Sequence, residues 1–203
     1  MPASVPTPAF VIVRHGNTFA AGEPPRRIGS RTDLPLTDAG LAQADALGAH
    51  FAVLGWRFAR VLTSPLLRTR DTAGAILRHL ADAPATEPTE WLREIDHGPD
   101  EDQPEGAVLA RIGADALAAW DSAGVPPPGW IVEPAMRVAE WRKLFARDDG
   151  PVLLVTSNGA ARFALLAAGL PGSGDLKLPT GAFGALRRQA DGDLHLECWG
   201  VRP

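Results

Sequence analysis

The sequence predicts an α/β fold in three αβα layers, with a mostly parallel central sheet, helices on both faces and a helical insertion near the site. Two runs at 10–13 and 152–155 are apolar without interruption, which is typical of strands buried on both faces of a parallel sheet. Segments with apolar residues at helical spacing alternate with such runs. The 203 residues suit one domain, so we predict a single domain over 1–203 with a helical cap at about 100–150.

Composition and charge exclude several classes of protein. Hydrophobic residues make up 45% and charged residues 22%, and the net charge of −4 offers no general basic surface for nucleic acid. The single cysteine, Cys198, cannot form an internal disulfide, which favours a reducing compartment. The first residues lack the features of a signal peptide, and no apolar run could span a membrane. We expect a cytoplasmic protein without nucleic-acid or membrane partners. The sequence leaves open whether the chain forms a homodimer.

The first predicted strand, at 9–14, ends in Arg14, His15 and Gly16. Open α/β sheets bind ligands at such strand ends, and an arginine beside a histidine indicates an anion site with a possible base or nucleophile. An irregular stretch at 19–35 follows, and it contains three arginines. These arginines either face the same pocket or belong to a solvated loop, and both interpretations stay open.

A helix is predicted from Thr37, a suitable N-cap, to Gly55. Its buried stripe should consist of Leu41, Ala44, Leu47, Gly48 and Phe51. A second strand at 60–63 leads into a helix that begins at Ser64 and Pro65. Arg68 lies in the first turn of that helix, so we expect it level with Arg14 and His15.

The middle of the chain has weaker strand signals and many acidic residues. A strand at 86–91 is interrupted by Pro88, and the segment 92–106 carries six carboxylates that we expect to be mostly solvated. Glu94 is the exception, because its apolar neighbours should hold it against a hydrophobic wall. Helices at 105–122 and 134–147 form the predicted insertion. Its tryptophans should pack in the core rather than bind ligands: Trp120, Trp130 and Trp141.

Another apolar strand, at 151–156, ends in Ser157, Asn158 and Gly159 and passes into a helix at 160–170. The strands at 182–189 and 193–199 should form an antiparallel hairpin with His195 facing solvent. Polar residues therefore follow three apolar strands, and we expect all three groups to meet at one edge of the sheet.

Five motifs in order along the chain resemble the histidine phosphatase superfamily, also called phosphoglycerate mutase-like. They are RHG at 14–16, RIGSRTDLPLT at 27–37, SPLLRTRDTA at 64–73, LREIDHG at 92–98 and SNGAAR at 157–162. Several motifs in register are far more specific than RHG alone. The resemblance covers nearly the whole chain and weakens only in the helical insertion.

The resemblance implies roles for particular residues. His15 would be the nucleophile that forms a phosphohistidine, and Glu94 would protonate the leaving oxygen and then activate water. Arg14 and Arg68 would bind the phosphoryl oxygens with Asn158, and no metal or other cofactor is needed. The substrate-binding residues would be Asn17, Thr18, Arg27 and Gly159.

The chain departs from the family pattern near these residues. Asn158 stands where the family usually has a second histidine, so a neutral donor replaces a charged one. Asn17 replaces the usual glutamate after RHG, and the W-E-G that follows the LREI element in the family is absent. His97 is a candidate for the missing histidine, although we expect it in a solvated loop.

These features predict a metal-independent phosphomonoester hydrolase that acts on a small phosphorylated metabolite. Because the acidic segment at 96–105 should lie at the pocket mouth and repel polyanions, we expect a substrate with a neutral or cationic tail. The same reasoning disfavours the alternative of phosphoglycerate mutase-type transfer, which must hold two phosphates. Asn158 raises another alternative, a weakly active or inactive relative that binds phosphorylated ligands.

Overall fold

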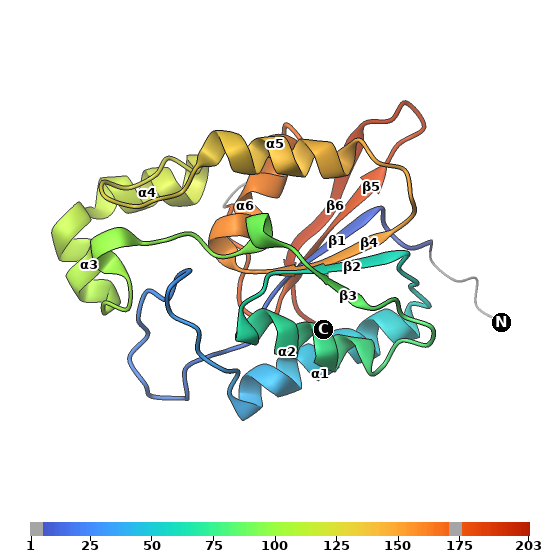
Figure 1. Ribbon diagram of the computed structural model, residues 1–203, viewed down its shortest axis with the longest axis horizontal. Coiled ribbons are helices and arrows are strands. Elements are labelled where there is room, and N and C mark those ends of the chain that lie inside the picture. The colour runs from blue at the N-terminus through green and yellow to red at the C-terminus, as the bar shows by residue number, and fades with distance from the viewer. Residues whose placement is uncertain (1–5, 171–175) are drawn as a thin grey trace.

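The computed structural model describes residues 6–170 and 176–203, and its centre is a six-stranded sheet (Figure 1). The strands are β1 (Phe10–Arg14), β2 (Arg60–Thr63), β3 (Thr86–Pro88), β4 (Val152–Thr156), β5 (Phe183–Arg188) and β6 (Leu194–Val201). Their spatial order is β3-β2-β4-β1-β5-β6. The first four in this order are parallel, whereas β5 and β6 are antiparallel to their neighbours. The predicted mostly parallel sheet is confirmed.

Helices cover both faces of the sheet, which confirms the three αβα layers (Figure 1). Helices α1 (Asp38–Val53) and α2 (Leu67–Leu77) pack on one face, and α5 (Pro134–Phe145) and α6 (Asn158–Ala167) pack on the other. No helix within the described residues combines the length and apolar character that crossing a membrane requires.

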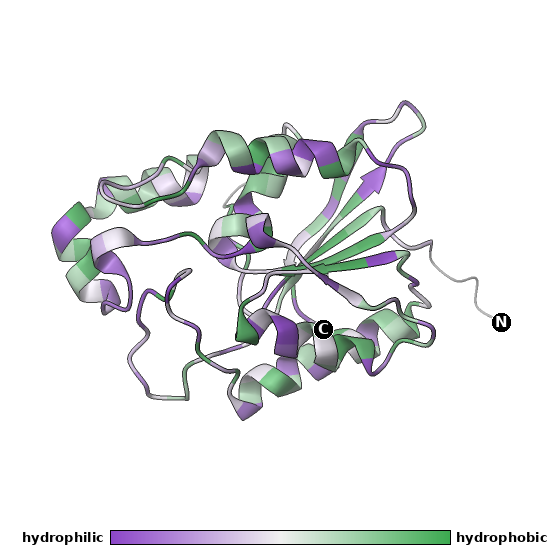
Figure 2. Cartoon of the chain, viewed as in Figure 1, coloured by the Kyte–Doolittle hydropathy of each residue, from purple (hydrophilic) through white to green (hydrophobic). Residues whose placement is uncertain are grey.

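Strand β1 shows how the sequence produces these layers. Phe10 and Ile12 belong to the hydrophobic cluster on the α5–α6 side, and Val11 and Val13 belong to the cluster on the α1–α2 side. All four side chains are buried, as a continuous apolar run between two helical layers requires. The central strands are accordingly hydrophobic along their length, while the helices alternate between hydrophobic and hydrophilic residues (Figure 2).

The turn after β1 is fixed by a close backbone contact with α1. A side chain at Gly16 would clash with the carbonyl of Gly40, and a side chain at Gly40 would clash with the carbonyl of Asn17. The predicted stripe of α1 is correct except at Leu41, which is 37% exposed, while Gly40 is buried instead. The contact of the two glycines therefore sets the position of the chain around His15.

Two predicted elements in the middle of the chain are wrong. The helix at 105–122 is divided into α3 (Glu105–Ile112) and α4 (Ala114–Ala123), because Gly113 has a φ of +82° that a continuing helix excludes. The strand at 86–91 is limited to β3 and continues as a 3₁₀ turn at Glu90–Leu92. Helix α5 of the predicted insertion packs on the sheet beside α6, so only α3 and α4 extend beyond it (Figure 1).

Candidate active site

The carboxyl ends of β1, β4 and β2 meet at one edge of the sheet, beside a pocket of about 520 Å³. Arg68 lies in the first turn of α2, and Asn158 is the first residue of α6. Eight of the nine predicted site residues line this pocket: Arg14, His15, Asn17, Thr18, Arg27, Glu94, Asn158 and Gly159. The ninth, Arg68, contacts His15 directly. The structure thus brings all nine residues together.

His15 presents one ring nitrogen that can react. Its Nδ1 lies 2.8 Å from the carbonyl oxygen of Gly16, which can only accept, so Nδ1 carries the proton. Nε2 therefore keeps its lone pair and accepts a hydrogen bond from Arg68 Nε at 3.2 Å. Burial, and then the charges of Arg68 and Arg14, lower the pKa of His15 well below its ordinary value of 6.5. The imidazole is neutral at pH 7, as a nucleophile must be.

The two arginines are held differently. The Arg68 side chain is fully buried, and besides the imidazole it donates to the carbonyl oxygens of Thr32 at 2.7 Å and Gly29 at 3.1 Å. Arg14 donates from Nη1 to the carbonyl of Leu178 at 2.9 Å, and within the described residues its buried Nε has no partner. Burial lowers the pKa of Arg14 to about 10, which leaves the guanidinium charged at neutral pH. The pair forms an anion site beside the neutral imidazole.

Glu94 is buried and its carboxylate is oriented by two backbone amides. Oε1 accepts from the N–H of Ile95 at 2.9 Å, and Oε2 accepts from the N–H of Gly159 at 3.1 Å. Leu92 and Ile95 are inaccessible to solvent, so the hydrophobic wall predicted for Glu94 is present. A side chain at Gly159 would clash with the carboxylate. Gly159 therefore positions Glu94 in addition to lining the pocket.

Asn158 is fixed through the peptide of Leu178. Its Oδ1 accepts from the N–H of Leu178 at 2.9 Å, and the carbonyl oxygen of the same residue accepts from Arg14. Because the oxygen of the amide is engaged, Nδ2 is the end of Asn158 that can donate to an anion in the pocket. The backbone of one residue thus orients two of the predicted phosphate ligands.

The family model of the histidine phosphatase superfamily, branch 1, matches residues 10–199 of the chain. The chain belongs to this superfamily. A 2,3-bisphosphoglycerate-dependent phosphoglycerate mutase of Rhizobium etli is 36% identical over 124 residues, covering 59% of this chain and 57% of that protein. Fructose-2,6-bisphosphatase TIGAR of Xenopus tropicalis is 33% identical over 129 residues, covering 62% of this chain and 44% of that protein. The match spans about half the length of these curated relatives.

Solved structures share the fold over nearly the whole chain. A mycobacterial glucosyl-3-phosphoglycerate phosphatase has a TM-score of 0.76 at 21% identity, covering 96% of this chain and 99% of that chain. A protein of Thermus thermophilus has a TM-score of 0.65 at 30% identity, covering 92% of this chain and 96% of that chain. The predicted superfamily and fold class are both confirmed.

One side of the pocket in this histidine phosphatase superfamily member is built from two loops, residues 26–32 and 96–105, which we call the loop wall. Most of its carboxylates form ion pairs with arginines, and these pairs are Arg26–Asp102, Arg27–Glu105, Arg31–Asp96 and Arg111–Asp100. The prediction of a solvated acidic segment is therefore wrong for Asp96, Asp100 and Glu101, whereas Asp102 and Glu105 are nearly half exposed. The prediction failed because three of the neutralising arginines come from a loop 65 to 78 residues earlier in the chain.

His97 also differs from its prediction. It is buried rather than solvated, lines the pocket, and packs edge-on against Trp130 with ring centroids 4.6 Å apart. Its Nδ1 lies 3.5 Å from Oε2 of Glu101, whose side chain is 7% exposed. Trp120 is buried as predicted, but it lines the pocket as well.

Sequence reasoning missed a further part of the pocket lining, namely Asp121 in α4 and Lys177 and Thr180 in the segment before β5. These residues belong to no motif, and their spacing follows no helical or strand period. Only the fold brings the segment before β5 next to the end of β1, where Gly181 N–H donates to the carbonyl of His15.

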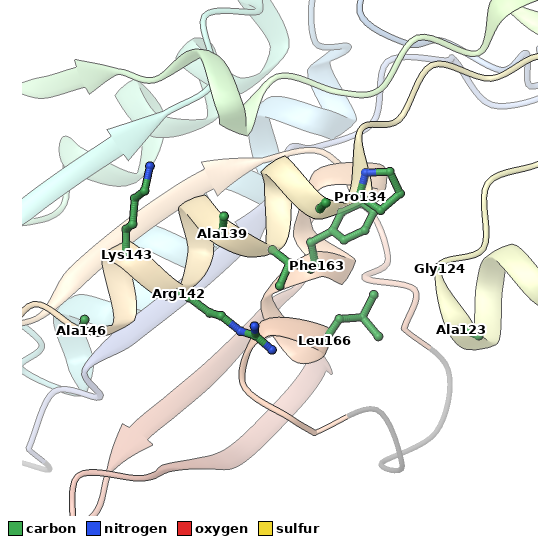
Figure 3. A pocket seen from close by; sticks show the side chains of 11 residues that line it. Ala123, Gly124, Pro134, Ala139, Arg142, Lys143, Ala146, Phe163 and Leu166 are labelled. Atoms are coloured by element: carbon green, nitrogen blue, oxygen red, sulfur yellow. The ribbon is translucent and has the colours of Figure 1, made fainter.

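The structure contains another cavity, of about 840 Å³, between α5 and α6 and near the end of α4 (Figure 3). Its lining is mainly apolar, with Phe163 and Leu166 on one side and the cations Arg142 and Lys143 from α5. Its described lining contains no histidine, serine, threonine, cysteine or carboxylate, so we look for the chemistry in the pocket at the strand ends. Among the described residues, no three His, Cys, Asp or Glu side chains lie close enough to hold a metal ion.

Proposed function

We propose that this chain is a phosphomonoesterase that forms a phosphohistidine at His15 and hydrolyses a small phosphorylated metabolite without a metal ion. The observation that carries the proposal is the neutral His15, whose Nε2 lone pair accepts from the Arg68 guanidinium and whose ring is also subject to the charge of Arg14. Such a nitrogen is a nucleophile, and the guanidinium groups attract the phosphoryl group that it attacks. The superfamily assignment and the phosphatase names of similar proteins support the same reaction class.

The reaction proceeds in two displacements at phosphorus. In the first, His15 Nε2 forms a P–N bond while the P–O bond to the leaving group breaks, and protonated Glu94 gives its proton to the leaving oxygen. In the second, Glu94 takes a proton from water, the water oxygen attacks phosphorus, and the P–N bond breaks. Inorganic phosphate leaves, and both side chains return to their starting states.

The arginines and Asn158 stabilise the charge that develops on the phosphoryl oxygens. Arg68 Nε–H, which donates to His15 in the free protein, is placed to donate to a phosphoryl oxygen once Nε2 bonds to phosphorus. The Nδ2 group of Asn158 supplies a neutral donor. Removing one preorganised donor of this kind costs about 10²–10³ in kcat, so both arginines should be essential.

Substrate charge is less restricted than the sequence predicts. The predicted repulsion of polyanions depends on unpaired carboxylates at the pocket mouth, but Asp102 and Glu105 pair with Arg26 and Arg27, which themselves line the pocket. Substrates with a second anionic group are therefore compatible with the electrostatics of the site.

This change favours a second candidate, phosphoglycerate mutase-type transfer. Arg26 and Arg27 could hold the second phosphate that a mutase requires, and two curated relatives carry that name. In a mutase the phosphohistidine returns its phosphoryl group to a bound phosphoglycerate instead of to water. The two reactions differ in the acceptor and share the step at His15.

The test is turnover of a panel of phosphate monoesters in EDTA, with the same protein assayed for interconversion of 2- and 3-phosphoglycerate in the presence of 2,3-bisphosphoglycerate. The variant His15→Ala should abolish turnover, and His195→Ala, which removes an exposed histidine of β6, should not. A wild-type protein that hydrolyses no monoester but interconverts phosphoglycerates would establish the mutase. Turnover that survives in His15→Ala would refute both.

A protein with neither activity would be a phospho-ligand-binding relative, the alternative that Asn158 raises. In that case Asn158→His should restore hydrolysis by supplying the missing charge. If activity does not rise in this variant, Asn158 is no handicap to the enzyme.

A further inference from the structure

We propose that Glu101 is a positioning residue for the reaction at His15, because its carboxylate organises the loop whose carbonyl groups hold Arg68 against the nucleophile. This inference rests on the proposed function and extends it to the loop wall. Glu101 does not line the pocket, so it acts through Arg68 and not on the substrate.

The Glu101 carboxylate accepts hydrogen bonds from four groups of two loops. Oε1 accepts from Gly29 N–H at 2.9 Å, Arg31 N–H at 3.1 Å and Thr32 Oγ1 at 2.8 Å. Oε2 accepts from His97 N–H at 3.2 Å. One buried side chain therefore connects residues 29–32 to the segment that follows Glu94.

The same short loop binds Arg68 from its other side. Gly29 donates its N–H to Glu101 and accepts from Arg68 Nη2 with its carbonyl. Thr32 donates its hydroxyl to Glu101 and accepts from Arg68 Nη1 with its carbonyl. Arg68 then donates its Nε–H to His15. Both residues that hold Arg68 are thus held by Glu101, and the chain of contacts ends at the nucleophile.

Glu101 differs from the other carboxylates of the loop wall in what neutralises it. Asp96, Asp100, Asp102 and Glu105 each pair with an arginine, whereas Glu101 accepts from backbone and hydroxyl donors and lies 3.5 Å from Nδ1 of the buried His97 ring. Burial alone would raise the pKa of Glu101, but the His97 side chain, then the Thr32 hydroxyl and the backbone N–H groups of His97 and Gly29, outweigh burial and lower the pKa to about 2. An anion held by oriented donors at neutral pH keeps a loop in one conformation.

A side chain of similar shape cannot replace Glu101 without disturbing these hydrogen bonds. In Glu101→Gln, an amide oxygen can still accept from three donors, but its NH₂ group then faces the N–H of His97 at 3.2 Å and must turn toward the His97 ring nitrogen Nδ1, 3.5 Å away, to find an acceptor. Donor against donor is repulsive, so the loop must shift. A matched control exists in the same loop: Asp102→Asn removes the same charge from a partly exposed pair with Arg26.

The first test is a double-mutant cycle in kcat/KM for p-nitrophenyl phosphate. Glu101→Gln alone should lower kcat/KM by about 10- to 100-fold, because misplacing a catalytic group by 1 Å costs about 10²-fold. In an Arg68→Ala background the same substitution should change kcat/KM by less than about threefold, because residues that act as a unit are not additive. If kcat/KM of the double variant falls by the product of the two single-variant factors, the proposal is overturned. The kcat/KM of Asp102→Asn should stay within about twofold of the wild-type value.

The second test observes Arg68 without turnover. The ¹⁵N–¹H spectrum should contain a slowly exchanging Arg68 Nε–H signal, assigned by its loss in Arg68→Lys. This signal should broaden or exchange rapidly in Glu101→Gln and persist in Asp102→Asn. An unchanged signal in Glu101→Gln would overturn the inference even in an active enzyme. An inactive wild-type protein that shows the expected change would refute the proposed function and support the inference.

If Glu101→Gln does not fold, Thr32→Val removes only the hydroxyl that donates to the carboxylate. It should shift the Arg68 signal in the same direction with a smaller loss of kcat. No effect of Thr32→Val on either measurement would count against the proposal.

Discussion

The strand-end cluster of His15, Glu94 and Asn158 and the loop wall line the same pocket but are held by different forces. In the cluster each of these side chains is oriented by backbone groups of the sheet edge. In the loop wall the side chains are oriented mainly by ion pairs between two loops that are distant in sequence. The geometry required by the proposed chemistry therefore comes from the backbone of the fold, while the shape of the pocket depends on charge pairing.

Among substitutions that keep every proposed catalytic side chain, the largest effect should come from breaking the cluster at Gly159. In Gly159→Ala the new Cβ would clash with Oε1 of Glu94, so the carboxylate must leave the position where the N–H of residue 159 holds it. We expect kcat on a phosphomonoester to fall by about 10²-fold, the usual cost of misplacing a catalytic group by 1 Å. The measurement is steady-state kinetics on the purified variant.

A matched control is Gly74→Ala in α2, where a Cβ meets no atom within 4 Å. That substitution should leave kcat unchanged and stabilise the protein by about 0.5–1 kcal/mol, because alanine restricts the unfolded chain and favours helix. If Gly159→Ala retained wild-type kcat, Glu94 would not need its observed position, and its assignment as the acid would fail.

The same contrast explains which residues of the site can be predicted from the sequence. Arg14 and His15 adjoin in a short motif at the end of an apolar strand, so the local pattern is enough to place them. Residues without such a motif are misjudged: the sequence predicts His97 and Glu101 in solvent, yet the side chains of both are buried. The environment of Glu101 depends on loop residues about 70 positions earlier, and no local spacing encodes that pairing.

A second prediction distinguishes the two regions by the pH at which each loses its contribution to stability. The His15 pKa is lowered in the folded state, so the unfolded chain binds the proton more readily, and its contribution to stability is lost as pH falls below 6.5. The Glu101 pKa is lowered from 4.5 to about 2, so its contribution is present above 4.5 and lost between pH 4.5 and 2. The cluster should weaken first and the loop wall later.

Urea unfolding from pH 7 to pH 2 follows both steps. A shift of the size given for Glu101 corresponds to about 3 kcal/mol when the loss is complete. Glu101→Gln should be less stable at pH 7, and its unfolding free energy should not fall further with pH below 4.5. In His15→Ala the unfolding free energy should not fall with pH just below 6.5. Identical pH slopes in wild type and Glu101→Gln would show that the loop wall does not rest on this carboxylate.

The smallest effect should come from an exposed pair of the loop wall. Arg31 donates to Asp96 at 3.1 Å and to the Gly98 carbonyl at 2.6 Å, but its side chain is 55% exposed. Water screens such a pair, so Arg31→Gln should cost less than about 1 kcal/mol of unfolding free energy. In about 0.5 M NaCl the difference from wild type should shrink further, because salt screens exposed charges. A loss above about 2 kcal/mol that salt leaves unchanged would mean that the hydrogen bond to Gly98, and not charge, holds this part of the loop wall; the two regions would then be held by the same force.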